Sequence, residues 1–468
     1  MRLLFLAALA ILSSACATTQ VSVNLPVPPP SYSAVISGAM PSKAAWAGFG
    51  DVGLTEWITQ VQAHNTEVTI GLARLDASAA QIRAVASEAM PRVDAQVTLE
   101  RQKVSPRDPG FIDLDPPLRN PSTRTSAQLI LGYEIDLRGR VKHAERASQA
   151  DHEADEFDLR ALHLSLARQT ALLWFARAHR AAEVEVALQN QENKRVLYEG
   201  EEARRTVGLI SGSALGDLAV QLAAAQAEVI GLREALQKVN RGLCQLAALS
   251  PSECLLPLAL PLTHMQIPVI GAGLPAALLE RRPDLAAAQA RYDAARARVN
   301  SAQAMRWPSL TLSGLLGVSG ANESDLTKPD ALMWSLMPQL LVPIFDAGRR
   351  KAEVSRAEAQ AVEQVTVWRA AVIRAVHEVE NAAATMAAAE VQTQARLQQL
   401  SVAEHQLAAT RAKRSVGRGA LREVLISNLA MQSAKTQWLT VRVDHLSASA
   451  ELIAALGGGW KMEHADNE

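Results

Sequence analysis

The stretch that decides the fold is residues 203–208, which read ARRTVG, because residues 412–417 repeat it as AKRSVG. A second match supports the first, since ARLD at residues 73–76 returns as ARYD at residues 290–293. The matching segments keep the same order along the chain. Self-similarity of this kind predicts that the chain contains two copies of one structural unit.

The alignment of the two copies needs gaps at only two places, and these places predict where the turns lie. Insertions are tolerated in surface turns and damage the interior of helices and strands. We therefore expect each copy to contain one turn within residues 104–124 or 319–331. A second turn should follow Gly208 in the first copy and Gly417 in the second.

Between the predicted turns lie long runs that favour helices. Residues 54–90 contain no Pro and are rich in Ala, Leu and Gln, and residues 284–307 behave alike. Residues 137–207 as one helix would be about 105 Å long, and residues 214–249 would run back beside it. A hairpin of this length cannot bury its own apolar seam, so it needs lateral neighbours, as the helices of a coiled coil do.

Four shorter segments alternate apolar and polar residues instead. They are residues 93–100, 128–135, 310–318 and 332–345. Alternation over about ten residues is the pattern of a strand in a membrane β-barrel. No stretch after the N-terminus reaches the roughly 20 apolar residues of a membrane-spanning helix, so a membrane crossing would have to use strands.

Four strands cannot close a barrel within one chain, because open sheet edges are not tolerated in lipid. Two chains would supply eight strands and a lumen nearly filled by side chains, whereas three chains would supply twelve strands and leave room for a channel. We therefore predict a barrel shared among several chains, with three or more copies if solutes are to pass through it.

The N-terminus is a separate element. Arg2 precedes an unbroken apolar run at residues 3–12, and small residues lead to Cys16. This pattern is typical of a signal peptide that is removed, and Cys16 after small residues resembles a bacterial lipoprotein processing site. We expect lipid on Cys16, the alternative being an ordinary signal peptide with an incidental Cys. Ala17 favours delivery to the outer membrane.

The net charge of the chain and the spacing of its His and Cys residues argue against several classes of function. Lys and Arg number 47 against 48 Asp and Glu, which gives a net charge of −1 and no electrostatic case for nucleic acid. His163 and His377 have no second His or Cys one helical turn away, so we predict no metal site, and we find no catalytic arrangement or cofactor motif. Cys244 and Cys254 could form a disulfide in an oxidising compartment or could be two small buried residues.

Several motifs resemble a known family, the TolC-like outer-membrane factors, and in particular their NodT-type efflux lipoprotein branch. Residues 281–285 read RRPDL and residues 307–310 read WPSL. Residues 133–140, YEIDLRGR, and residues 343–349, PIFDAGR, resemble the two strand-to-helix junctions of that family. The resemblance runs from about residue 40 to residue 457, in order and in both halves.

The resemblance implies a mainly α fold with membrane β. Three copies would form an α-helical periplasmic tunnel and a shared twelve-stranded outer-membrane barrel, working with a periplasmic adaptor and an inner-membrane pump. The expected organisation is a signal peptide at 1–15, a lipid-anchored extended segment at 16–53, a first repeat at 54–250, a linker at 251–274, a second repeat at 275–459 and a tail at 460–468.

The resemblance also implies two kinds of site. The hairpin turns would contact the adaptor through Val207, Gly208, Leu209, Ile210 and Ser211, and through Val416, Gly417, Arg418 and Gly419. The alternative is that each Gly only closes its turn and the apolar pair packs internally. Glu423, with Asp217 nearby, would form an acidic ring at the periplasmic aperture, the alternative being an exposed helix carboxylate.

The sequence thus predicts the exit duct of an export system, which is not an enzyme and which passes small molecules to the exterior. The competing prediction is a lipid-anchored periplasmic coiled-coil adaptor or scaffold. Such a protein would share the signal peptide, the lipid and the helical hairpins. It would not need two pairs of alternating strands that follow the repeat.

Overall fold

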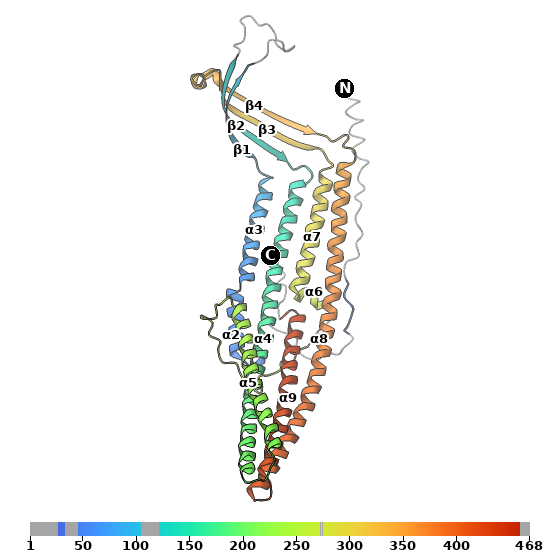
Figure 1. Cartoon of the computed structure of the whole chain (residues 1–468). Coiled ribbons are helices and arrows are strands. Elements are labelled where there is room, and N and C mark those ends of the chain that lie inside the picture. Colours follow the sequence, from blue (N-terminus) through green and yellow to red (C-terminus); the bar gives the residue numbers. More distant parts are fainter. Residues whose placement is uncertain (1–26, 33–44, 104–120, 272, 274, 459–468) are drawn as a thin grey trace. The chain divides into compact units, whose positions relative to one another are not determined.

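The computed structural model describes residues 27–32, 45–103, 121–271, 273 and 275–458 (Figure 1). The described residues form two compact units, and each unit contains segments from both halves of the chain. The first unit contains Ala79–Asp151 and Arg291–Arg369, and the second contains Val27–Ser78, His152–Ala290 and the part of the chain from Ala370 onwards. The expected signal peptide, Cys16 and the tail at 460–468 lie outside the described residues.

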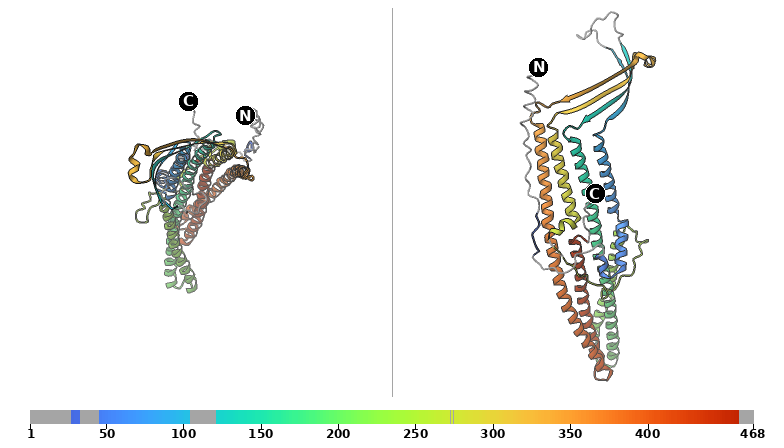
Figure 2. Two further views of the ribbon diagram at one scale, coloured as in Figure 1. Left: turned by 90° about the horizontal axis from the view of Figure 1, so that it is seen from above. Right: turned by 180° about the vertical axis from the view of Figure 1, so that it is seen from behind.

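The first unit contains one antiparallel sheet of four strands in the order β1-β2-β3-β4 (Figure 2). The strands are β1 (Arg92–Gln102), β2 (Ser122–Ile135), β3 (Ser309–Gly320) and β4 (Leu332–Leu341). The four predicted strands are confirmed, although β4 ends at Leu341 and not at residue 345. The strand stops there because Leu341 pairs with Ser309, the first residue of its partner strand β3.

The register gathers most of the apolar residues of the four strands on one face. Leu129 of β2 pairs with Ala95 of β1 on one side and with Leu316 of β3 on the other, and Leu316 pairs with Trp334 of β4. Since side chains alternate between faces along a strand, the residues that share this face are Val93, Ala95, Val97, Leu99, Ala127, Leu129, Leu131, Leu310, Leu312, Leu316, Val318, Leu332, Trp334, Leu336 and Leu340. We call it the apolar sheet face.

The opposite face, which we call the polar sheet face, carries Asp94, Gln96, Thr98, Glu100, Ser126, Gln128, Thr311, Ser313, Ser335 and Gln339, together with the apolar residues Ile130, Leu315, Met333, Met337 and Leu341. Gln128 Nε2 donates to Gln96 Oε1 across β1 and β2 at 3.1 Å. The apolar face is exposed, with Val97 78% and Trp334 74% accessible. A monomeric soluble protein rarely leaves an apolar surface of this extent uncovered, so this face needs another environment.

Helices of the first unit pack through small residues. Ala295, Val299 and Ala302 of α7 (Pro283–Ala304) form a buried cluster with Val354, Ala357 and Ala361 of α8 (Arg349–Ser415). The Tyr292 ring stacks on the Trp368 ring at a centroid distance of 6.0 Å. Alanine at the contact lets two helix backbones approach closely, which holds α7 and α8 side by side below the sheet.

The second unit contains the helical hairpins. In it α5 (Gly212–Leu246) returns beside α4 (Arg140–Thr206), and α9 (Leu421–Ala455) returns beside α8 (Figures 1 and 2). The long helices α4 and α8 have 67 residues each, and the return helices α5 and α9 have 35 each. Equal lengths in corresponding places confirm the prediction of two internal repeats.

Among the described helices, α5 alone is long and apolar enough to cross a membrane by length and composition. Such a single helix is weak evidence for a crossing, because a packed helix passes the same test. Val220 and Ile230 of α5 are 70% and 69% exposed. Val220 and Ile230 of α5 are therefore left uncovered by the described residues.

The helical run predicted over residues 54–90 is interrupted, and in this respect the prediction is wrong. The chain forms α2 (Val52–His64) and α3 (Thr66–Ser87), separated by Asn65 in an extended conformation. Asn65 Oδ1 accepts the N–H of Glu67 at 2.8 Å, and Asn65 Nδ2 donates to the Leu246 carbonyl oxygen at 2.8 Å. Asn is a favoured N-cap, so it ends one helix and begins the next.

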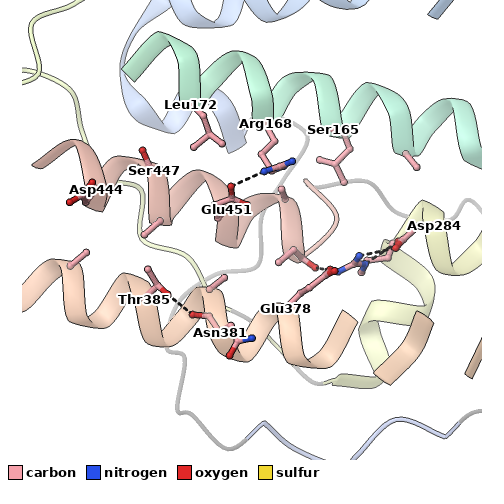
Figure 3. Close-up of a pocket in the computed structure, with 18 of the residues that line it drawn as sticks. Ser165, Arg168, Leu172, Asp284, Glu378, Asn381, Thr385, Asp444, Ser447 and Glu451 are labelled. Atoms are coloured by element: carbon pink, nitrogen blue, oxygen red, sulfur yellow. Dashed lines mark hydrogen bonds and ion pairs between the residues drawn. The ribbon is translucent and has the colours of Figure 1, made fainter. Parts of the chain in front are cut away.

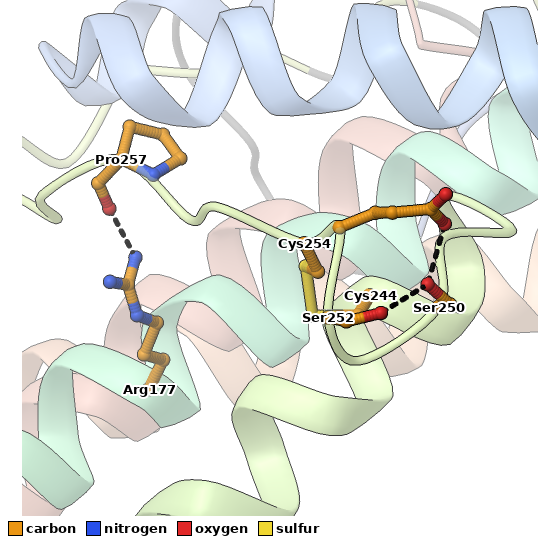
Figure 4. The surroundings of a disulfide bond; sticks show 7 residues. Arg177, Cys244, Ser250, Ser252, Cys254 and Pro257 are labelled. Atoms are coloured by element: carbon orange, nitrogen blue, oxygen red, sulfur yellow. Dashed lines mark hydrogen bonds between the residues drawn. A yellow bond between two sulfur atoms is a disulfide. The ribbon is translucent and has the colours of Figure 1, made fainter.

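The described residues of the linker after α5 form no helix or strand, and hydrogen bonds fix them to the helices. Arg177 Nη1 donates to the Pro257 carbonyl oxygen at 2.6 Å, and Arg442 Nη2 donates to the Met265 carbonyl oxygen at 2.5 Å. Burial lowers the pKa of both arginines from the usual value. At the start of the linker a disulfide joins Cys244 and Cys254 (Figure 4), which is one of the two states that the sequence left open.

Candidate functional site

The first hairpin turn is closed by Gly208. Its φ is +76°, a left-handed conformation that glycine adopts without strain. The Gly208 N–H donates to the Arg205 carbonyl oxygen at 2.9 Å, and the Leu209 N–H donates to the Arg204 carbonyl oxygen at 3.0 Å. This pair of bonds is a Schellman motif. Ser211 then caps α5, because its Oγ accepts the Ala214 N–H at 3.3 Å.

The second hairpin turn repeats that geometry at Gly417, whose φ is also +76°. The Gly417 N–H donates to the Arg414 carbonyl oxygen and the Arg418 N–H donates to the Lys413 carbonyl oxygen, both at 2.9 Å. Ala420 stands at the N-cap of α9 and makes no side-chain cap bond. The backbones of the two turns therefore agree, whereas their side chains do not.

Exposure at the turns differs between the copies. Val207 and Leu209 are 69% and 64% exposed at the first turn, with Ile210 half-buried. At the second turn Val416 is 69% exposed, and Arg418 stands where the first turn has Leu209. The first turn therefore presents an apolar surface to its surroundings, and the second presents a mixed one.

The second turn is also strongly basic. Residues 411–423 include five exposed cations, Arg411, Lys413, Arg414, Arg418 and Arg422, and one acid, Glu423. Glu423 is exposed, two residues into α9, and Asp217 is exposed near the start of α5. Near the first turn acids and bases are balanced more evenly, and Arg204 pairs with Glu201 at 3.5 Å.

The family-like motif at residues 281–285 has a structural role in the second unit. Arg282 donates to Asp284 at 2.7 Å, to Glu378 of α8 at 2.6 Å and to the Ala455 carbonyl oxygen at the end of α9 at 3.2 Å. Burial lowers the pKa of Arg282, but the hydrogen bonds and charges of Asp284 and Glu378 raise it more, so its pKa lies above the usual value. Arg282 thus ties three segments together.

A groove of about 930 Å³ lies beside Arg282, between α4, α8 and α9 (Figure 3). Arg168 of α4 bridges part of it by an ion pair with Glu451 of α9 at 2.7 Å. Asn381 and Thr385 of α8 and Ser447 of α9 add polar groups to the lining. Sequence reasoning missed this groove, because its walls come from segments far apart in the chain.

The strand-to-helix junctions are built alike in both copies. Asp136 accepts the N–H groups of residues 140–142 at distances between 2.7 and 3.0 Å. Asp346 accepts the N–H groups of Gly348 and Arg350 at 3.1 and 3.2 Å. A carboxylate at this place satisfies the free N–H groups of a helix start and complements its dipole. These two aspartates therefore fix the direction in which each long helix leaves the sheet.

Comparison with known proteins identifies the family of this chain, in agreement with its sheet, its two repeats and its strand-to-helix junctions. Residues 57–248 and 274–458 match the family model described as outer membrane efflux protein. The chain belongs to this family. It follows that the chain is an outer-membrane efflux channel, as predicted, and the outer-membrane location is confirmed with it.

Relatives match along nearly the whole chain. The pyoverdine export outer membrane protein OpmQ of Pseudomonas aeruginosa is 29% identical over 472 residues, covering 99% of this chain and 98% of the relative. The outer membrane protein OprJ of the same species is 27% identical and covers 90% of this chain and 88% of the relative. These relatives share the family and extend over both repeats.

Solved structures share the fold. The CmeC outer membrane channel of Campylobacter jejuni superposes with a TM-score of 0.83 over 94% of this chain and 95% of its own, at 20% identity. The open state of the MtrE outer membrane channel of Neisseria gonorrhoeae gives 0.81 over 94% and 98%, at 23% identity. The predicted fold class is thereby confirmed, and the family match favours the duct over a periplasmic adaptor or scaffold.

Proposed function

We propose that three copies of the chain form one duct, which carries small molecules through a shared twelve-stranded barrel to the exterior. The apolar sheet face carries this proposal. It runs without interruption across all four strands, as a surface in contact with lipid requires. Within the described residues β1 and β4 each pair with a single strand, and an open edge in lipid leaves backbone groups unsatisfied at several kcal/mol each.

Pairing of β1 from one copy with β4 from the next removes both edges. Two copies would close eight strands around a lumen that side chains nearly fill, whereas three copies leave a passage. The exposed apolar side of α5, with Val220 and Ile230, gains a cover in the same assembly, since it can pack against a helix of a neighbouring copy.

The hairpin turns are our candidates for the surface that meets a periplasmic adaptor, which in turn would connect the duct to an inner-membrane pump. Val207 and Leu209 are exposed at a turn that Gly208 holds rigidly. An apolar pair held in a fixed geometry suits a protein interface. The second turn, with Val416 and Arg418, would make a more polar contact.

Glu423 and Asp217 are our candidates for the periplasmic aperture, because both are exposed within the first two turns of the helices that leave the hairpin tips. Three copies of each carboxylate around an axis would repel one another, and bound cations would relieve that repulsion. Lipid on Cys16 would add an anchor beside the barrel, and two or more acyl chains would make that anchor stable. Mass spectrometry of the mature N-terminus tests the lipid.

The deciding experiment is single-channel recording of the purified full-length protein in a planar lipid bilayer, together with native mass spectrometry in detergent. We expect discrete conductance steps and a trimer mass. A stable monomer, or a trimer that never conducts, would contradict the shared duct. A trimer that conducts only after the turns are altered would show instead that the aperture is closed at rest.

A further inference from the structure

A small pocket of about 220 Å³ lies in the first unit, where β2 and β4 end, β3 begins, and α4 and α8 begin. Its strand residues include Glu134, Ser309 and Leu341. Ser309 pairs with Leu341, and Glu134 pairs with Thr311, two residues after Ser309. Since alternate residues share a face, these three belong to the polar sheet face, whereas Ile135, which also lines the pocket, belongs to the apolar sheet face. Most of the strand residues that line the pocket therefore lie on the polar sheet face.

If the apolar sheet face contacts lipid, the polar sheet face lines the interior of the duct. In this respect the inference rests on the proposed function. A solute that leaves the helical part of the duct then passes the pocket as it enters the barrel.

The carboxylates in this pocket are already engaged. Glu134 pairs with Arg140 at 2.9 Å, Asp136 caps α4, and Glu353 pairs with Arg356 at 2.7 Å. All three contacts are made with residues of α4 or α8 near the starts of these helices. The three carboxylates are therefore not available to other cations. The negative charge of the pocket is therefore neutralised by the fold itself.

Two arginines in the pocket take no part in these contacts. Arg138 and Arg349 both line it and both are exposed. Among the described residues, neither has a carboxylate within ion-pair distance, whereas neighbouring Arg350 pairs with Asp346 at 3.1 Å. Guanidinium groups bind carboxylates in a two-pronged geometry and hold their charge at all relevant pH values. The pocket thus has a surplus of positive charge.

Trp307 holds one of these cations in place. The Arg138 guanidinium carbon lies 3.8 Å above the centre of the Trp307 ring. A cation over the face of an indole is attracted by the ring. The ring therefore restrains the long Arg138 side chain, and its positive charge is not neutralised by an ion pair. Such a cation can still accept an anion from solution.

This pair combines one residue from each repeat, and the corresponding positions of the other junction do not reproduce it. The residue of the first copy that aligns with Trp307 is Met90. The second copy has the single residue Ala347 where the first copy has Leu137 and Arg138. The capping aspartates, by contrast, are present in both copies. A junction can therefore be built without the pair, and we look for a role outside folding.

We propose that this pocket is a transit site for small organic anions inside the duct, in which Arg138 and Arg349 bind the anionic group and Trp307 positions Arg138. Three copies around the duct would carry six such arginines at one level. A ring of charge in a confined aqueous passage raises the local concentration of solutes of opposite sign.

The test uses the full-length protein in detergent micelles with benzoate as the probe, measured by saturation-transfer NMR. Loss of one charge-assisted contact of about 1.4 kcal/mol weakens binding about tenfold, so we expect at least that rise in the benzoate Kd for Arg138→Gln combined with Arg349→Gln. Trp307→Ala should weaken binding and Trp307→Phe should restore it, since a ring beneath Arg138 is what matters. Native mass spectrometry checks that each variant remains assembled.

Arg124→Gln is the matched control, because Arg124 is an exposed arginine on the polar sheet face at the far end of β2. It should leave the benzoate Kd unchanged. Benzyl alcohol, which has the same ring without the charge, should show no dependence on Arg138 or Arg349. Benzoate binding that is absent in the wild type, or equal in the wild type and the double variant, would overturn the proposal. So would an equal loss in Arg124→Gln.

The NMR measurement does not require an open channel, so failure of the site and failure of the duct can be told apart. Arginine-dependent benzoate binding by a protein that never conducts would support the site and refute the duct. In a conducting protein, millimolar benzoate should reduce the current of the wild type more than that of the double variant. A conducting protein whose current responds to benzoate equally with and without the two arginines would refute the site alone.

Discussion

Replacing Asp51 by Ala should release the linker of the second unit from its helices. The Asp51 carboxylate is 4% exposed and accepts three hydrogen bonds. Its Oδ1 accepts the Leu54 N–H of α2 at 3.2 Å, and its Oδ2 accepts Trp174 Nε1 of α4 at 2.8 Å and the Leu260 N–H of the linker at 3.0 Å. One carboxylate therefore joins the start of a helix, the middle of another helix and the linker.

The magnitude follows from those contacts. A hydrogen bond to a charged group contributes about 1.5–3 kcal/mol, and a buried donor left without a partner costs about as much. Ala also removes the cost of burying the carboxylate, so we take the low end and expect a local loss of about 3 kcal/mol. That loss corresponds to roughly 100-fold more frequent opening. Hydrogen exchange of residues 257–262, followed by mass spectrometry, should accelerate by this factor.

Two variants make the measurement specific. Trp174→Phe keeps an aromatic ring and removes one donor, so it should accelerate exchange by about tenfold. Glu56→Ala removes an exposed carboxylate from the same helix, α2, and should change exchange by less than about threefold. If Asp51→Ala also remains within threefold of the wild type, Asp51 is not what fixes the linker and the reasoning fails.

Three further predictions concern other parts of the chain. Leu209→Asp should abolish export while the trimer still forms, because charge is tolerated at an exposed turn but not in an apolar interface; unchanged export would exclude Leu209 from the adaptor contact. Cys244→Ser with Cys254→Ser should lower local stability by up to about 2–3 kcal/mol, seen as faster proteolysis of the linker, and unchanged proteolysis would contradict this. Glu423→Gln should reduce the cation preference of the channel at low salt and leave the conductance at high salt unchanged, because screening weakens surface charge there; an unaltered preference would make Glu423 an ordinary solvated residue.

The sheet was predictable because lipid and water impose opposite demands on its two faces. Val93 to Leu99 alternate with Asp94 to Glu100, and that pattern is readable one strand at a time. The hairpin turns were predictable for a similar local reason, since Gly208 and Gly417 permit the left-handed conformation that the reversal needs. In both cases the information lies within a few residues of the feature.

The features that were missed depend on contacts between distant segments. Asn65 interrupts the predicted helix because its carboxamide also bonds to Leu246, 181 residues further along the chain. The junction pocket depends on Arg138 lying over Trp307, residues that belong to different repeats. Neither contact leaves a periodic signal in the sequence. Local propensity is a weak prior that tertiary contacts override, and these contacts are of that kind.

Duplication of the chain offers a way to separate what the fold requires from what one site adds. The glycines at the hairpin turns and the aspartates at the helix starts are present in both copies with the same backbone geometry. By contrast, Leu209 aligns with Arg418, and Trp307 aligns with Met90. A residue type that the shared element requires recurs in both copies, as the turn glycines do, although a helix cap such as Ser211 can serve one copy alone. Exposed side chains without a match are therefore the first places to seek contacts with partners and solutes, and the uneven charge of the two hairpin turns would let a partner meet them in two different ways.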